Sequence, residues 1–335
     1  MTPMFGKVKL SITSACGGTC AFCYRARESQ RTHLPASIIE KTLQDVVRVG
    51  CEVIHVSGGD PLMHPEFGHI MNSVFKTGIP VKLSANPSAL SKSQIRGWQS
   101  SGLVELGLSL NSLRADVHDD VRGIPGEYNK ILNLLHELAD NGPRIMITFV
   151  VTDANVTDLL GLPRLLEIGA NVWVKAQLPE RTLITRYPEA HYPRWYSVTA
   201  IRGFADAAVS LDSEGRTAEK LILIPQVPRH QPVPDWLIGR WSQGLFGPDP
   251  TENAHCAFML NNPHIKEDGA ICTCCGRSED RVLGNVYSSD GLTNLYAQHI
   301  DRHRNHTHLP YLSCQYCVFW SYYAMGLRER YHASH

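Results

Sequence analysis

Hydrophobic and polar positions along residues 7–177 follow two alternating periods. Short runs with apolar residues at every second position are separated by longer runs with apolar residues three and four positions apart. This is the pattern of strands that alternate with amphipathic helices. The helical pattern is clearest at Ser37–Val49, and it recurs at Tyr128–Ala139 and Asn155–Leu166. The predicted strands are Val8–Ile12, Val53–Ser57, Val81–Ser84, Leu106–Leu110, Ile145–Val151 and Val172–Ala176.

This alternation predicts an α/β fold. Six βα units are expected to form a parallel sheet that curves into a partial (β/α)6 TIM-like barrel over residues 1–177. Active sites of such barrels lie at the carboxyl ends of the strands. The residues that directly follow each strand are therefore the first candidates for chemistry.

The composition changes after Gln177. Residues 178–254 are rich in proline and aromatic residues and are too apolar for a disordered segment, so we expect a linker or insertion that covers the open side of the barrel. A second group of cysteines then begins. This second group lies within residues 255–335.

Charge and cysteine usage narrow the class of protein. The 32 basic and 32 acidic residues balance, which argues against nucleic acid as a partner. The chain shows no secretion signal, and its apolar runs are far shorter than the roughly 20 residues that span a bilayer, so no membrane association is expected. Ten cysteines gather mainly near the two ends of the chain. That distribution predicts metal ligands in a reducing cytoplasm rather than a disulfide framework.

The first cysteine group, Cys16, Cys20 and Cys23, follows the first predicted strand. Three thiolates at this spacing can hold three irons of a cubane cluster and leave the fourth iron without a protein ligand. Such an iron can bind a small molecule, whereas four cysteines would make only an electron carrier. Zinc sites usually need four ligands from two separate cysteine pairs. Three unconnected thiols on a loop are the alternative interpretation.

The spacing Cys-x3-Cys-x2-Cys, with the aromatic Phe22 before the third cysteine, resembles the radical S-adenosylmethionine (radical SAM) superfamily. The resemblance implies a [4Fe–4S] cluster on the three cysteines and S-adenosylmethionine (SAM) bound at the open iron beside Phe22. It also implies reductive cleavage of SAM to a 5′-deoxyadenosyl radical, which abstracts hydrogen from a substrate. The cofactors supply this reactivity, and the protein supplies position and exclusion of water.

Gly58, Gly59 and Asp60 follow the second predicted strand. Two glycines allow a close backbone approach to a ligand, and a carboxylate beside them can accept an ammonium group. A plain turn is the alternative. The segment is similar to the family's Gly-Gly-Glu-Pro motif, which binds the methionine amino group, although Asp60 is one methylene shorter than Glu.

The resemblance extends to later strand ends. Ser84 and Asn86 stand where related enzymes have a Thr-Asn-Gly segment that touches the methionyl part of SAM. Ser109 and Asn111 stand where the family often has Ser-Leu-Asp and uses polar side chains on ribose or carboxylate, although Asn111 lacks the charge of Asp. Arg122 resembles the arginine of the family's Arg-Gly segment, which can pair with the methionine carboxylate.

The second cysteine group comprises Cys256, Cys272, Cys274, Cys275, Cys314 and Cys317. The spacing of Cys256, Gly269 and Cys274 resembles the opening of the twitch and SPASM domains, which carry auxiliary clusters in many radical SAM enzymes. The resemblance implies a second [4Fe–4S] cluster on Cys256, Cys274, Cys314 and Cys317. Too few cysteines follow for a full SPASM domain, so the resemblance implies the shorter twitch form, a small C-terminal α+β domain over residues 255–335. A four-cysteine zinc ribbon is the alternative.

Cys272 and Cys275 are left over beside this predicted cluster. Either one could replace Cys274 as a ligand, serve as a small apolar filler, or donate a hydrogen atom to a substrate radical, as an epimerase would require. Cys51 is expected to be a buried core residue.

The auxiliary cluster favours net oxidation of the substrate, because it can accept an electron from the substrate radical. By resemblance to aminocyclitol dehydrogenases, we expect dehydrogenation of a sugar, aminocyclitol or nucleoside in specialised metabolite biosynthesis. Epimerisation and C–C bond formation are alternatives. A peptide maturase is another, but the first strand starts near residue 8 without a leader-binding segment, which favours a small molecule. A flavodoxin or ferredoxin is expected as the electron donor.

Overall fold

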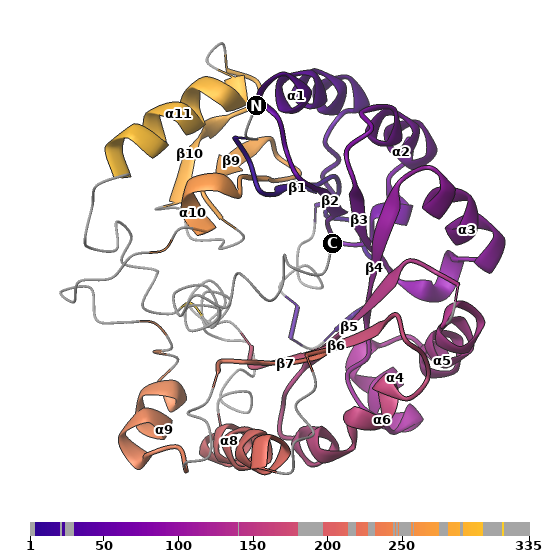
Figure 1. Ribbon diagram of the computed structural model, residues 1–335, viewed down its shortest axis with the longest axis vertical. Helices are drawn as coiled ribbons and strands as arrows, with labels where there is room; N and C mark the ends of the chain where they lie inside the picture. The colour runs from indigo at the N-terminus through magenta and orange to yellow at the C-terminus, as the bar shows by residue number, and fades with distance from the viewer. Residues whose placement is uncertain are drawn as a thin grey trace.

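The computed structural model of the chain describes residues 4–20, 22–23, 30–139, 141–179, 197–213, 219–226, 232–243, 258–274, 281–288 and 291–303, together with residues 245, 247, 256 and 317. Within them the chain forms a ten-stranded, mostly parallel sheet with the strand order β10-β9-β8-β1-β2-β3-β4-β5-β6-β7. The sheet curves through most of a circle, and the helices lie around its outside (Figure 1). The predicted partial α/β barrel is therefore confirmed.

The first six strands agree with the predicted ones in number and place. Each pairs in parallel with the next, and β1 also pairs in parallel with β8. The strands are β1 (Val8–Ser11), β2 (Ile54–Ser57), β3 (Val81–Ser84), β4 (Leu103–Ser109), β5 (Arg144–Val150), β6 (Val172–Gln177), β7 (Leu221–Ile224), β8 (His264–Ile265), β9 (Ala270–Cys272) and β10 (Val282–Asn285).

The helices form where apolar residues recur at helical spacing. In α1 (Ala36–Val49) the side chains of Ile39, Leu43 and Val46 are buried, and the helix ends at Gly50, whose φ of 81° favours glycine. The other helices are α2 (Phe67–Lys76), α3 (Lys92–Ser100), α4 (Ala115–Arg122), α5 (Glu127–Leu138), α6 (Pro163–Leu166), α8 (Val198–Ser213), α9 (Asp235–Ser242), α10 (Phe258–Asn261) and α11 (Gly291–His303), with short 3₁₀ turns η2 (Pro61–Met63), η3 (Pro87–Ala89) and η4 (Val156–Gly161).

The prediction of one helix over Asn155–Leu166 is wrong. The segment forms the 3₁₀ turn η4 and then the short helix α6, which begins at Pro163. Proline has no backbone N–H and is tolerated in the first turn of a helix, so it starts a new helix here instead of continuing the old one.

The two faces of the sheet differ in chemistry. Apolar residues such as Val8, Leu10 and Ile54 pack with the helices in one core cluster. On the other face, one row of paired positions crosses the sheet from β8 to β5 and carries mostly charged residues. In register order the row is His264, Lys9, His55, Lys82, Glu105 and Arg144. Glu105 forms ion pairs with Lys82 (3.2 Å) and Arg144 (3.6 Å).

The region expected to be a linker contributes to the barrel. Its described part contains α8 and α9, and β7 pairs in parallel with β6. The C-terminal region also joins the sheet, because β8 pairs with β1 and continues through antiparallel β9 and β10. Strands from all three predicted regions therefore belong to one sheet. The boundaries near residues 177 and 255 remain predictions.

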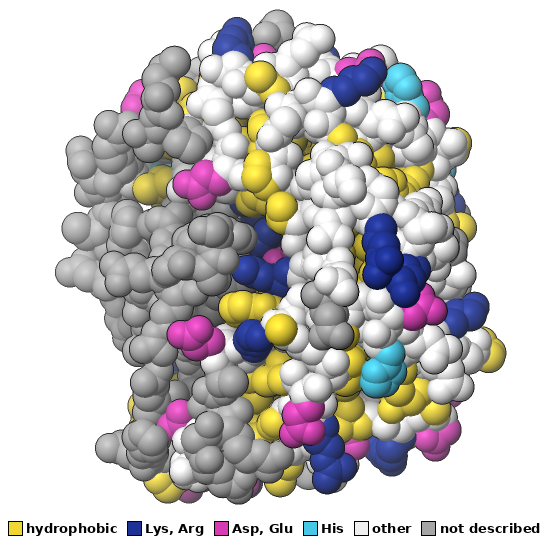
Figure 2. All heavy atoms as spheres, turned by 45° about the vertical axis from the view of Figure 1, so that its right-hand side comes forward, with side chains coloured by type: hydrophobic (Ala, Val, Ile, Leu, Met, Phe, Trp, Pro, Cys, Tyr) yellow, Lys and Arg dark blue, Asp and Glu magenta, His cyan; other side chains and the backbone are white. Residues whose placement is uncertain are grey.

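The outer surface drawn in Figure 2 carries side chains of several kinds. On the face drawn in Figure 2, basic and acidic side chains are interspersed with apolar ones. None of the helices in the described residues has both the length and the apolar composition needed to cross a bilayer.

Candidate functional site

The first cysteine group lies just beyond the carboxyl end of β1, where a barrel enzyme holds its chemistry. Cys20 is 4% exposed, whereas Cys16 and Cys23 are partly exposed. The backbone N–H of Cys23 donates to the carbonyl of Cys20 at 2.9 Å, which makes a tight turn around Phe22. Burial raises the pKa of the Cys20 thiol to about 11, although the nearby Arg122 opposes this shift.

Gly58 and Gly59 hold the end of β2 against this loop. The N–H of Gly59 donates to the carbonyl of Thr13 and that of Asp60 to the carbonyl of Ala15, both at 2.7 Å. A Cβ atom on either glycine would overlap these carbonyl oxygens. The glycine pair predicts a close approach to a ligand, but the close approach in the structure is to the chain's own backbone.

Asp60 is 7% exposed and lies beside the third strand end. Its Oδ1 accepts from the N–H of Leu62 at 3.3 Å and from the N–H of Asn86 at 3.4 Å. Burial raises the pKa of this carboxyl, although the two N–H donors oppose the shift. The Asp60 carboxylate therefore stands within one connected group of polar residues at the carboxyl edge of β2 and β3.

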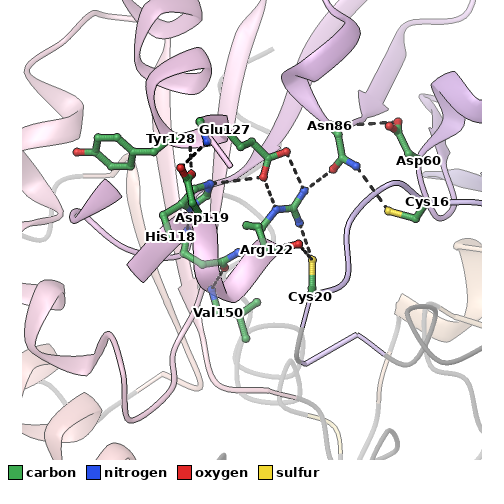
Figure 3. A network of polar contacts seen from close by, with 12 residues as sticks. Cys16, Cys20, Asp60, Asn86, His118, Asp119, Arg122, Glu127, Tyr128 and Val150 are labelled. Carbon is green, nitrogen blue, oxygen red and sulfur yellow. Dashed lines mark hydrogen bonds and ion pairs between the residues drawn. The ribbon is translucent and has the colours of Figure 1, made fainter. Parts of the chain in front are cut away.

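Arg122 connects this group to the cysteines (Figure 3). Its Nη1 donates to the sulfur of Cys20 at 3.1 Å, and its Nη2 donates to Oδ1 of Asn86. Because a guanidinium has donors only, the amide oxygen of Asn86 faces Arg122 and the amide nitrogen faces away. That nitrogen donates to the sulfur of Cys16 at 3.5 Å. Two of the three predicted cluster ligands thus accept side-chain N–H donors.

Two residues that were not predicted from the sequence hold Arg122 in place. Glu127 is fully buried and accepts from Nε of Arg122 at 2.7 Å, and His118 Nε2 lies 3.5 Å from the same carboxylate. Burial alone would raise the pKa of Glu127, but His118 and Arg122 lower it below its usual value. An acidic residue five positions after the motif arginine, in the first turn of the next helix, was the available signal.

The other residues predicted to contact SAM lie at or just after the ends of β3 and β4. Ser84 Oγ lies 2.8 Å from Nε2 of His55, and Ser109 is partly buried at the end of β4. Asn111 is fully buried, and its Oδ1 accepts from the N–H of Val150 at 3.1 Å, which joins the ends of β4 and β5. The roles predicted for these residues toward SAM remain predictions.

The described part of the second cysteine group lies on the antiparallel extension of the sheet. Cys272 is fully buried on β9, and burial raises its pKa to about 11. Cys274 is partly exposed, and Arg281 Nη1 donates to its sulfur at 3.0 Å. Cys256 and Cys317 are also partly exposed. Cys275 and Cys314 lie outside the described residues, so the four-cysteine ligand set and the hydrogen-donor role of Cys272 or Cys275 remain predictions.

Within the described part of the chain, no three Cys, His, Asp or Glu side chains already stand in a metal-binding arrangement. The donors of the first cysteine group nevertheless fit an iron–sulfur cluster with three protein ligands. Three sulfurs come from eight consecutive residues, and two of them accept N–H donors, as cluster thiolates do.

The chain is similar in sequence to a known family and to several known enzymes. Residues 10–162 match the model of the radical SAM superfamily. The chain is 23% identical over 313 residues to the PqqA peptide cyclase of Ruegeria pomeroyi, a match that covers 91% of this chain and 78% of that protein. It is 25% identical over 159 residues to the Fe-coproporphyrin III synthase of Methanosarcina barkeri, covering 47% of this chain and 40% of the synthase.

Among solved structures, Streptococcus suis SuiB bound to its precursor peptide SuiA has a TM-score of 0.61 at 15% identity, covering 88% of this chain and 66% of SuiB. This likeness supports the fold, a barrel of TIM type. The chain spans about half the length of several curated relatives that it matches, at 40%, 43% and 57%. Residues 10–162 of the chain therefore form a domain of the radical SAM superfamily, whose members bind a [4Fe–4S] cluster and SAM.

Proposed function

We propose that this chain is a radical SAM enzyme that modifies a peptide by hydrogen-atom abstraction. The observation that carries the proposal is the match to a PqqA peptide cyclase over 91% of the chain, far beyond the domain at residues 10–162. The likeness in fold to SuiB, seen with a precursor peptide, agrees with it. A peptide maturase was the alternative in the sequence analysis, and these comparisons support it better than dehydrogenation of a sugar or aminocyclitol.

The protein's part in this chemistry is to hold and orient. When bound, the first cluster and SAM supply an electron and a carbon-centred radical that removes a hydrogen atom from the substrate. Cys16, Cys20 and Cys23 would hold that cluster. Asp60, whose carboxylate lies beside Asn86, would accept the SAM amino group. Cys256, Cys274, Cys314 and Cys317 would hold a second cluster.

A second candidate keeps a small molecule as substrate, and one observation favours it. The inner face of the sheet carries Lys9, His55, Lys82 and Arg144 in one row with the carboxylate of Glu105. Burial and the neighbouring lysines hold the pKa of His55 well below its usual value. A positively charged interior suits a phosphorylated or carboxylated substrate.

One experiment tests the proposed function and separates the two candidates. The full chain is reconstituted with iron and sulfide, reduced, and given SAM, and 5′-deoxyadenosine is measured by mass spectrometry. Co-expression with a short peptide encoded beside the gene should change the mass of that peptide. No 5′-deoxyadenosine from iron-loaded protein would overturn the radical SAM activity. Production of 5′-deoxyadenosine with unmodified peptide would leave the small-molecule candidate in its place.

A further inference from the structure

Two side-chain N–H donors point at sulfurs of the first cysteine group, and one residue links them. Arg122 donates to Cys20 at 3.1 Å, and Asn86 donates to Cys16 at 3.5 Å. Arg122 also donates to Asn86, which fixes the orientation of the Asn86 amide. The side chains of Arg122 and Asn86 are thus bonded to each other, and each donates to one of the two cysteines (Figure 3). Asn86 follows the end of β3, and Arg122 is the last residue of α4.

The guanidinium has little freedom to leave this position. Arg122 is 5% exposed, and its donors are shared among Cys20, Asn86 and Glu127. Glu127 is in turn held by His118, whose Nδ1 accepts from the N–H of Asn111 at 3.0 Å. A chain of buried contacts thus runs from the end of β4 to the cysteine loop.

The backbone of Arg122 is fixed to the same loop. Its carbonyl oxygen accepts from the N–H of Thr19 at 3.0 Å. Gly123 ends α4 at φ 65°, and a Cβ atom there would overlap the side chain of Thr19. Main chain and side chain of Arg122 therefore both contact the cysteine loop, so the distance from guanidinium to sulfur is set by rigid parts of the fold.

We propose that Arg122 and Asn86 are positioning residues that donate hydrogen bonds to the cluster ligands Cys20 and Cys16 and thereby raise the reduction potential of the first cluster. The inference rests on the proposed function, because it requires the cluster to be present. Hydrogen bonds and positive charge at cysteine sulfurs stabilise the extra electron of a reduced cluster, and removing them lowers its potential. A cluster with a lower potential would be harder for an electron donor to reduce.

This role differs from the one implied by the family resemblance, in which Arg122 pairs with the methionine carboxylate. If Arg122 paired with the SAM carboxylate, replacing Arg122 would weaken SAM binding and leave the potential of the SAM-free cluster unchanged. If Arg122 instead donates to the sulfur of Cys20, replacing Arg122 would change the potential of the cluster even in the absence of SAM. Measurement on the SAM-free protein therefore separates the two roles.

The experiment is a redox titration of the reconstituted, SAM-free full chain, followed by the EPR signal of the reduced cluster, with iron content measured on the same samples. To keep the second cysteine group from contributing, all samples carry Cys274→Ala. The test variants are Arg122→Met, Arg122→Lys and Asn86→Ala. The control is Arg114→Met, which removes a half-exposed arginine that contacts Asp158 and the carbonyl of Ala154.

We expect the midpoint potential to fall most in Arg122→Met, less in Asn86→Ala, and to be partly restored in Arg122→Lys, with no change in the control. If Arg122→Met fails to fold, Asn86→Ala decides the question. Unchanged potentials at full iron content, with weakened SAM binding, would overturn the proposal in favour of the carboxylate role. Failure of the proposed function is a separate result, namely an intact cluster that yields no 5′-deoxyadenosine.

Discussion

The two cysteine groups have one feature in common and differ in how it is built. In each group a buried arginine donates to a cysteine sulfur, Arg122 to Cys20 at 3.1 Å and Arg281 to Cys274 at 3.0 Å. The first pair is 102 residues apart in the sequence, and the second is seven residues apart. The first group therefore depends on the assembly of the barrel, whereas the second uses a local contact on the extension formed by β9 and β10.

The two groups should therefore be sensitive to substitutions in different parts of the chain. The loop of Cys16, Cys20 and Cys23 is held by backbone contacts from the ends of β2 and α4, so distant substitutions should disturb it. The described part of the second group is held within a short antiparallel extension, so its neighbours in sequence matter most. Changes in one group should leave the other largely intact.

Replacement of a first-group ligand should have the largest effect. In Cys20→Ala we expect 5′-deoxyadenosine to fall to background, because the buried central cysteine of the predicted ligand triad is lost. Mass spectrometry of the reduced, SAM-treated protein measures this, and iron analysis should show that only part of the iron is lost. Cys51→Ala, at a buried cysteine outside both groups, serves as the control. Turnover that survives in Cys20→Ala would break the assignment of the first group.

Replacement in the second group should separate SAM cleavage from product formation. In Cys274→Ala we expect 5′-deoxyadenosine to persist while the modified substrate falls by at least about tenfold, since only the first group is predicted to act on SAM. Metal analysis of the parent should find iron and no zinc at this group. Zinc in purified parent protein, or loss of SAM cleavage in the variant, would contradict the predicted division of roles.

Backbone packing around the first group should be tested at Gly59. Gly59→Ala would drive a Cβ atom into the carbonyl of Ala15, and we expect it to lower the free energy of unfolding by about 2–4 kcal/mol. Gly68→Ala on α2 is the matched control, because its Cβ meets open space and alanine should stabilise the helix by up to about 1 kcal/mol. Chemical denaturation measures both. Equal stability of the two variants would show that the contact between the ends of β1 and β2 is not rigid.

Stability of the C-terminal region should depend on pH through His299 on α11. Burial, and secondarily the neighbouring His303, lower its pKa from 6.5 to about 4. Between these values the unfolded chain binds more protons than the folded one, so stability should be full above pH 6.5 and decline as the pH falls toward 4. The loss should not exceed about 3 kcal/mol.

The measurement is thermal unfolding across this pH range, compared with His299→Gln. The variant should show a shallower decline than the parent. Identical pH profiles would mean that His299 titrates normally in the folded protein.

Several features of the molecule follow from local sequence alone. The six parallel strands β1–β6 were predicted from period-two and helical patterns, because each pattern is set by which side of a strand or helix is buried. The chemistry of Cys16, Cys20 and Cys23 was also predicted from local sequence, because all three residues lie within eight consecutive positions at a spacing that resembles a family motif.

Other features required the tertiary structure. β7 and β8 were missed because short strands give little periodic signal and are defined by the partners beside them, β6 and β1. Glu127 and His118 could not be linked to Cys20, because the sequence of an acidic residue is the same whether its side chain faces solvent or a buried arginine. Gly59 was recognised, but its reason was not: a glycine that admits a ligand and one that admits the carbonyl of Ala15 have the same sequence. Local preference fixes the elements, and only long-range packing decides which polar groups meet.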